Sequence, residues 1–205
     1  MTARTSDKAT VRATRSDGKR TRAAILRTAA EMATVEGIDG LSIGGLAAEL
    51  GMSKSGLYAH FGSKVELQLA TVEEAGRIFE ETVVAPALAA PTAHDRLLAL
   101  GELYVQHLRD RVFPGGCFFA GAALEMGSRP GPVREAIAEF QRRLTMMFAE
   151  LVVLAQREGH LAGEDPRGLA FEINGQFLAA SAGFTLTGDA AVLDLADEVL
   201  RRRLS

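Results

Sequence analysis

The stretch Ser42–Lys64, SIGGLAAELGMSKSGLYAHFGSK, decides how the rest of the chain is interpreted. Ser42 is a good N-cap for a first helix, because the apolar residues after it repeat at helical spacing. Gly51 follows where the chain must reverse, since glycine tolerates a positive φ. Ser53 can cap a second, short helix over Lys54–His60. Two short helices that cross over a turn of a few residues form a helix-turn-helix, and the sequence predicts one here.

The second helix carries unusual residues on its outward face. A helix selected for stability alone would not contain Gly56, since glycine destabilises helix interiors. Small residues and hydrogen-bond donors suit a helix that lies in a DNA groove. The alternative is a packing helix of an ordinary all-helical domain. The residues expected to form a DNA-binding surface are Ser42, Ser53, Lys54, Ser55, Gly56, Tyr58, His60 and Lys64.

A slightly longer segment, LAAELGMSKSGLYAHFGSKVEL, resembles the signature of the TetR family of transcriptional regulators. The resemblance implies an all-α protein of about nine helices. It would have an N-terminal three-helix DNA-binding domain and a C-terminal helical domain for ligand binding and dimerisation. It also implies that Lys64 meets a DNA phosphate, helped by the positive start of its helix. The residues that carry the resemblance are Ala47, Gly51, Ser53, Leu57, Tyr58, His60, Phe61, Lys64 and Leu67.

Charge is divided unevenly along the 205 residues. Up to Lys64 there are 10 Lys and Arg against 6 Asp and Glu, hence +4; the remainder has 13 against 20, hence −7. A basic N-terminal part and an acidic remainder suit a protein that presents one end to DNA. The single cysteine excludes a disulfide framework, and no apolar run has the length of a membrane span or a signal peptide. We therefore expect a cytoplasmic protein with no membrane partner.

The periodicity predicts three regions and nine helices. Residues 1–16 are expected to be a flexible basic arm, residues 17–64 the helix-turn-helix domain, and residues 65–205 the ligand-binding and dimerisation domain. The arm is either a mobile tail or a source of further DNA contacts. Helices are expected near residues 18–36, 42–50, 54–60, 63–84, 94–112, 117–127, 132–158, 166–187 and 190–203.

The last two expected helices are rich in apolar and small residues. By the resemblance they pair with the same helices of a second subunit, and the alternative is that they complete the subunit core. A second argument also favours a homodimer, because one short recognition helix reads few bases. A two-fold dimer presents two such helices to a palindromic operator. The residues expected at this interface are Phe171, Leu178, Ser181, Leu195 and Val199.

The C-terminal domain also contains the candidate effector site, around the segment Pro114–Phe119. Apolar walls with a few polar groups describe a pocket for a small apolar or amphipathic effector, but they also describe any helical core. The better polar candidates are Tyr104, His107, Asn174 and Gln176, because buried polar groups need partners. The residues expected to line the pocket are Tyr104, His107, Cys117, Phe118, Phe140, Met147, Asn174 and Phe177.

The sequence contains features of three other functions. Cys117 follows two glycines at an expected helix start, a setting that can lower a thiol pKa and make a redox or electrophile sensor. The alternative is a buried, inert cysteine. A thiol enzyme lacks a visible third catalytic group, and the four histidines show no metal-ligand spacing, so we expect no catalytic residue, metal or cofactor. A non-specific architectural DNA binder would need a broadly basic surface. A repressor released by a small molecule remains the best account.

Overall fold

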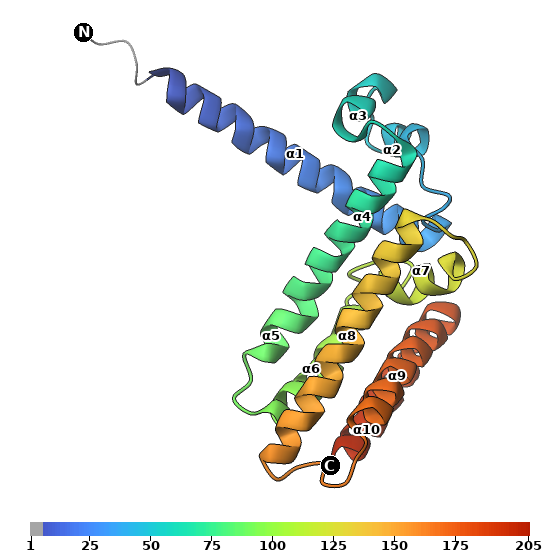
Figure 1. The fold of residues 1–205 in the computed structure, drawn as a ribbon. Helices are drawn as coiled ribbons and strands as arrows, with labels where there is room; N and C mark the ends of the chain where they lie inside the picture. The colour runs from blue at the N-terminus through green and yellow to red at the C-terminus, as the bar shows by residue number, and fades with distance from the viewer. Residues whose placement is uncertain (1–5) are drawn as a thin grey trace.

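The computed structural model describes the backbone of residues 6–205 and the side chains of residues 21–205. Within residues 6–205 every regular element is helical and no strand is present, which confirms the predicted all-α class. Only residues 1–5 of the predicted arm at residues 1–16 lie outside the described backbone. Residues 6–16 already belong to the first helix, which begins at Ser6 and not near residue 18 as predicted. That residues 1–5 form a flexible arm stays a prediction. The elements (Figure 1) are α1 (Ser6–Glu36), α2 (Ile43–Glu49), α3 (Lys54–Phe61), α4 (Lys64–Phe79), η1 (Glu80–Val84), α5 (Ala85–Leu88), α6 (Ala93–Arg109), α7 (Phe118–Met126), α8 (Pro132–Arg157), α9 (Pro166–Thr187) and α10 (Ala191–Leu204).

Elements α4, η1 and α5 follow one another without a break and form one long helical rod. The middle segment is a π turn, in which the Ala85 N–H donates to the Glu80 carbonyl five residues earlier. When the rod is counted as one helix, residues 6–205 contain nine helices, as the sequence predicted.

Serine side chains start three successive helices. The hydroxyl oxygens of Ser42, Ser53 and Ser63 accept the backbone N–H of the residue three positions later, at 3.0, 3.1 and 3.1 Å. Each bond satisfies one of the free N–H groups at a helix N-terminus. Between the first two helices, Gly51 has a φ of +63°, which confirms the turn expected there. The helix-turn-helix is therefore built from local signals.

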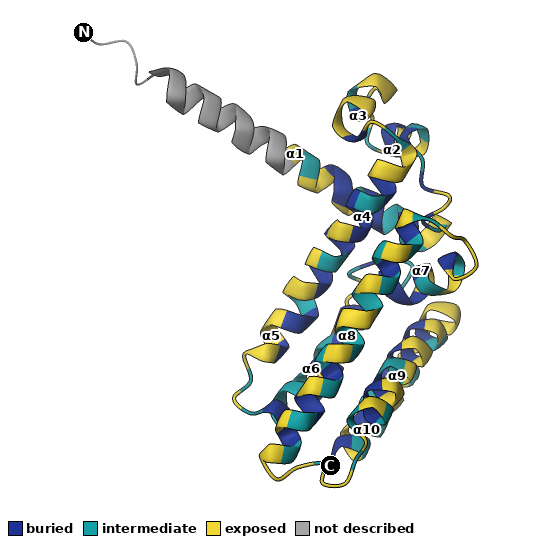
Figure 2. Ribbon diagram, in the orientation of Figure 1, coloured by how far each residue is buried: buried dark blue, intermediate teal, exposed yellow. Residues whose placement is uncertain are grey.

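Two apolar cores organise the chain, and α1 and α4 belong to both. The smaller core joins Ile25 and Ala29 of α1 to α2, α3 and the start of α4, where Leu67 and Ala70 pack beyond the expected domain boundary at residue 64. The larger core joins the rest of α1 and α4 to η1 and α5–α10. Figure 2 shows buried residues following the inward face of each helix in the described part. The two domains are therefore packed together through shared helices.

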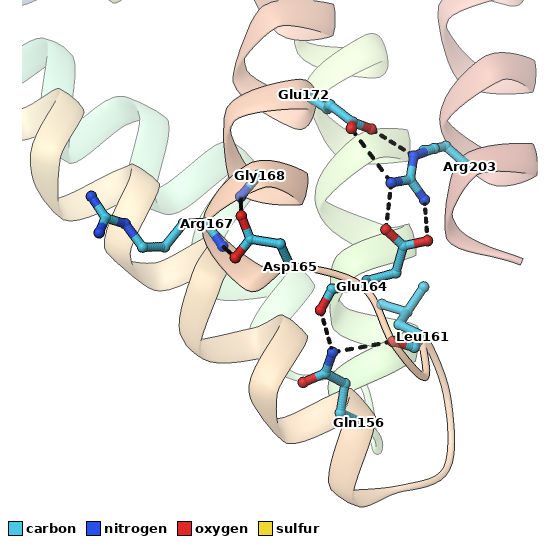
Figure 3. A network of polar contacts seen from close by, with 8 residues as sticks. All are labelled: Gln156, Leu161, Glu164, Asp165, Arg167, Gly168, Glu172 and Arg203. Carbon is cyan, nitrogen blue, oxygen red and sulfur yellow. Dashed lines mark hydrogen bonds and ion pairs between the residues drawn. The ribbon is translucent and has the colours of Figure 1, made fainter.

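The end of the bundle away from α2 and α3 is held by an ionic network (Figure 3). Arg203 of α10 donates to both oxygens of Glu164, at 2.8 and 2.6 Å, and its Nε donates to Glu172 of α9 at 2.5 Å. The Arg203 guanidinium lowers the pKa of Glu164 through these hydrogen bonds. Gln156 of α8 donates to the Glu164 carbonyl at 2.8 Å. The network therefore joins α8, α9 and α10 around the α8–α9 loop.

None of the helices in the described part of the chain is both long and apolar enough to cross a membrane.

Candidate DNA-binding surface and effector cavity

Helix α3 presents one polar face to solvent and one apolar face to the smaller core. Leu57 and Phe61 are buried, whereas 54% of Tyr58 is exposed. Arg22 of α1 fixes the far end of the helix, since it donates to the His60 carbonyl at 3.0 Å and lies 4.6 Å above the Phe61 ring. The predicted outward residues Lys54, Ser55, Tyr58 and His60 are all exposed, and Gly56 is partly exposed.

The other three predicted DNA-binding residues have structural partners in the free protein. The Ser42 and Ser53 hydroxyls accept helix N–H groups, so Ser42 keeps its own O–H to donate to a phosphate. The Ser53 hydroxyl also lies 3.2 Å from the Ser55 hydroxyl, and either of these two can donate to the other. Lys64 donates to the Asp39 carbonyl at 2.6 Å, and its Nζ lies 3.8 Å from the Asp39 carboxylate. A DNA phosphate would therefore compete with Asp39 for Lys64.

A cavity of about 270 Å³ lies among α4, α6, α7, α8 and α9. Five of the eight predicted pocket residues line it: Tyr104, Cys117, Phe140, Asn174 and Phe177. Ten further residues that line the cavity were not predicted as pocket residues: Phe79, Phe119, Ala120, Ala123, Leu124, Gln141, Leu144, Phe171, Gly175 and Leu178. Spacing from Phe140 offers a signal for Leu144, which lies four residues later on the same face of α8.

Three predicted pocket residues lie elsewhere. His107 is buried between η1 and the α6–α7 loop, where its ring packs edge-on against Phe79 and Phe113. Phe118 packs between Phe113 and Phe119 in the larger core. Met147 lines a separate outer groove of about 580 Å³ between α4 and α8. These residues belong to the core or the groove because neighbouring helices cover them, which the sequence pattern does not reveal.

Aromatic rings dominate the cavity wall. Tyr104 and Phe177 stack with ring centroids 3.9 Å apart, and Phe119 and Phe140 stack at 3.4 Å. The Tyr104 hydroxyl donates to the Phe177 carbonyl at 2.9 Å. The wall also contains the amides of Gln141 and Asn174, and none of the described lining residues carries a charge at neutral pH. The wall therefore suits a neutral, flat and mainly apolar molecule.

The environment of Cys117 contradicts the redox-sensor alternative. Its side chain is buried, and burial raises the pKa of the thiol instead of lowering it. Burial likewise raises the pKa of Tyr104 well above its usual value. Cys117 is therefore a protonated thiol at neutral pH, in line with the buried, inert alternative.

Exposed apolar residues lie on both α9 and α10, and we call this set of residues the α9–α10 face. Phe171, Leu178 and Leu195 are exposed on it, with 77% of Phe171 accessible. Val199 is partly exposed. Ser181 is a correction to the predicted interface: it is buried inside the subunit, where its hydroxyl accepts the Cys117 N–H at 3.1 Å. Phe171 and Leu178 also line the cavity, so the cavity reaches this face.

Comparisons with known proteins agree with this architecture. Residues 25–71 match the family model described as bacterial regulatory proteins, tetR family. Residues 93–200 match the model described as tetracyclin repressor-like, C-terminal domain. A comparison with curated proteins found no match.

Solved structures resemble the chain over most of its length. A TetR transcriptional regulator from Chloroflexus aurantiacus is 25% identical, with a TM-score of 0.82 and coverage of 90% of this chain and 93% of that one. AibR, solved with isovaleryl coenzyme A and operator DNA, is 26% identical, with a TM-score of 0.71 and coverage of 87% and 96%. A TetR-family regulator from Streptomyces coelicolor is 25% identical, with a TM-score of 0.75 and coverage of 91% and 95%. The chain belongs to the TetR family of DNA-binding transcriptional regulators.

Proposed function

We propose that the protein is a homodimeric repressor that leaves a palindromic operator when a small molecule fills the cavity. The observation that carries the DNA-binding part is the exposed polar face of α3, held in place by buried Leu57 and Phe61. Each subunit of the dimer places α3 in a major groove, and the two grooves face the same side of the duplex. A protein with this role works in the cytoplasm.

The DNA contacts divide into two classes. Lys54, Ser55 and Gly56 face base edges, Gly56 through close approach and its backbone. The remaining predicted residues position the protein on phosphates, which carry no sequence information. They are Ser42, Ser53, Tyr58, His60 and Lys64.

The proposed effector is a neutral, mainly apolar molecule with a planar part. The stacked rings of the cavity wall and its two amides support this class. AibR, of the same fold, was solved with an acyl coenzyme A and operator DNA. The phosphates of a coenzyme A need cationic partners, and the described cavity wall contains none. The effector releases DNA because it binds better to a state in which the two α3 helices are differently spaced.

The test is to incubate the protein with a randomised duplex pool at two salt concentrations and to sequence the retained DNA. We expect one inverted repeat, bound by two chains per short duplex. Retention without sequence preference, lost steeply with added salt, would instead indicate an architectural DNA binder. No retention from protein that has been unfolded, washed free of small molecules and refolded would contradict the proposed function.

Two substitutions test the division of contacts on the recovered operator. Tyr58→Phe should weaken binding to all sequences about equally, because it removes a phosphate contact. Lys54→Ala should also relax the base preference at one position, by about 1–3 kcal/mol of discrimination. A change of preferred sequence in Tyr58→Phe would overturn this assignment.

A further inference from the structure

The α1–α2 loop, residues 37–42, is held at Ile38 and Asp39 from α4, which belongs to both cores, and from α7 of the larger core. From α4, Gln68 donates to the Ile38 carbonyl at 2.6 Å and Lys64 donates to the Asp39 carbonyl at 2.6 Å. From α7, the Glu125 carboxylate accepts the N–H of Ile38 at 2.8 Å and of Asp39 at 2.9 Å. The loop leads directly into the Ser42 cap of α2, so its position sets where the helix-turn-helix begins.

The Glu125 carboxylate fits closely against the backbone of residues 37–39. One carboxylate oxygen serves each N–H, and hydrogen bonds to a charged acceptor are stronger than neutral ones. Gly37 has a φ of +83°, and a Cβ at this position would lie 2.8 Å from the Glu125 carboxylate. A glycine there provides both the backbone conformation and the space for the carboxylate.

The same short helix forms part of the cavity wall. Phe119, Ala120, Ala123 and Leu124 line the cavity, and Glu125 is the next residue along α7. A ligand that presses on this wall therefore displaces the helix that holds the α1–α2 loop. A shift of about 1 Å is enough to lengthen both Glu125 bonds beyond hydrogen-bonding distance.

Arg129, three residues after α7, provides a second way in which movement of α7 weakens DNA binding. Its guanidinium lies 2.5 Å from the Asp39 carboxylate, which also faces Lys64 at 3.8 Å. When α7 moves away, Arg129 leaves Asp39, and the Asp39 carboxylate then keeps Lys64 as its one cationic partner among the described residues. Lys64 is a proposed phosphate contact, so this pairing weakens DNA binding.

We propose that Glu125 is the positioning residue that couples occupancy of the cavity to the DNA-binding domain. The proposal rests on the proposed function, because it assumes that the cavity is the effector site. Glu125 does not line the cavity and is not one of the proposed DNA contacts; it acts through the backbone of Ile38 and Asp39.

The experiment compares the wild type with Glu125→Gln, using N-phenyl-1-naphthylamine, a neutral aromatic dye, as the cavity probe. Glutamine keeps the size of the side chain but loses its charge and one acceptor oxygen. The matched control is Glu102→Gln, which removes a carboxylate that pairs with Arg201 within the C-terminal domain. Dye fluorescence gives the probe Kd, and fluorescence anisotropy gives the Kd for the recovered operator with and without dye. Amide exchange at Ile38 and Asp39 is measured in the same samples.

We expect the dye to weaken operator binding at least about tenfold in the wild type and in Glu102→Gln. In Glu125→Gln the dye should bind within twofold of wild type but change the operator Kd less than twofold. Dye should also speed exchange at Ile38 and Asp39 in the wild type only. An equal effect of the dye in all three proteins would overturn the role of Glu125.

The amide-exchange measurement separates the two proposals. If no operator is recovered but dye speeds exchange at Ile38 and Asp39 only when Glu125 is present, the coupling stands and the proposed function fails. If dye binds and changes neither exchange nor operator affinity, the coupling through Glu125 is wrong, and so is the regulatory role of the cavity. Failure of the dye to bind the wild type would also contradict the coupling, because the cavity would then not accept a neutral aromatic ligand.

Discussion

At His107 the hydrogen-bond pattern fixes the position of the ring proton. The Thr82 hydroxyl lies 2.8 Å from the Ile78 carbonyl and 2.9 Å from His107 Nδ1. A carbonyl only accepts, so the hydroxyl proton goes to Ile78 and Nδ1 must donate to Thr82. Nε2 is then an unprotonated, buried atom without a hydrogen-bond partner among the described residues. Burial lowers the pKa of His107 to about 4, because protonation would leave a buried charge at Nε2.

This depressed pKa predicts a pH-dependent stability. In the unfolded chain a histidine has a pKa near ~6.5, so below that pH the unfolded state binds a proton that the native state does not. The stability that the neutral His107 ring contributes is fully present above pH ~6.5 and is lost as the pH falls toward about 4. Urea denaturation at pH 7 and at pH 5 measures the free energy of unfolding of the wild type and of His107→Leu. From pH 7 to pH 5 the wild type should lose about 2 kcal/mol more of this free energy than His107→Leu loses. Equal losses in the two proteins would contradict the buried neutral ring.

The single cysteine allows a direct test of burial at Cys117. A protonated, buried thiol reacts slowly with Ellman's reagent. We expect native protein at pH 8 to react at least ~100-fold more slowly than the same protein in urea, as measured by absorbance. Rapid reaction of one thiol per native chain would revive the sensor hypothesis.

At the scale of elements, the loop between α6 and α7 approaches α1 closely. The Gly115 N–H donates to the Thr34 hydroxyl at 3.1 Å, and a Cβ on Gly115 would lie only 1.9 Å from the Thr34 carbonyl oxygen. This approach, together with the Glu125 contacts, joins the two domains on the α7 side.

Gly115→Ala should therefore destabilise the protein by about 1–3 kcal/mol, because the backbone of α1 must move. The matched control is Gly121→Ala in α7, where a Cβ meets no atom within 4 Å. That substitution should stabilise by about 0.5–1 kcal/mol, because alanine is the better helix former. Urea denaturation midpoints measure both changes. Similar midpoints for the two variants would show that the loop can move away from Thr34.

Helix positions were predictable from sequence wherever a local signal exists. Serine caps gave the starts of α2, α3 and α4, and Pro166 with Gly188 gave the bounds of α9. The end of α6 was predicted three residues late. Arg111 ends that region with a φ of +48°, and no glycine or proline marks the position. Such a backbone conformation is imposed by tertiary contacts, which a local pattern does not contain.

The same distinction between local signals and tertiary contacts explains which site residues were predictable from the sequence. The exposure of the α3 residues was predictable because they lie within one short helix, Lys54–Phe61. That they contact DNA stays a prediction. The cavity was found in part, because its wall combines five helices and a sequence pattern does not tell a wall residue from a core residue. Ser181 shows the limit: it has the spacing of an interface residue, but it faces the Cys117 N–H inside the subunit.

At the scale of the whole molecule, the α9–α10 face predicts a dimer. Leu195 is 60% exposed there and does not line the cavity. Leu195→Glu should raise the dimer dissociation constant about thirtyfold or more, because it places a charge in an apolar interface. Analytical ultracentrifugation measures the change. Val35→Glu on α1, where 66% of the valine is exposed, is the control and should leave the dissociation constant unaltered. A monomeric wild type would contradict the proposed dimer.

The π turn at η1 has a consequence for how this chain aligns with its relatives. A π turn uses one residue more than an α turn to complete a circuit, so η1 accommodates an inserted residue without rotating the helix beyond it. Buried Val83 and Ala87 thus remain on the inner side of the rod. Loss of one exposed residue, Glu80 or Glu81, would restore a regular α-helix. The buried faces of α4 and α5 would then still point to the same side. A one-residue gap at this place in an alignment therefore marks a length difference that the fold absorbs locally.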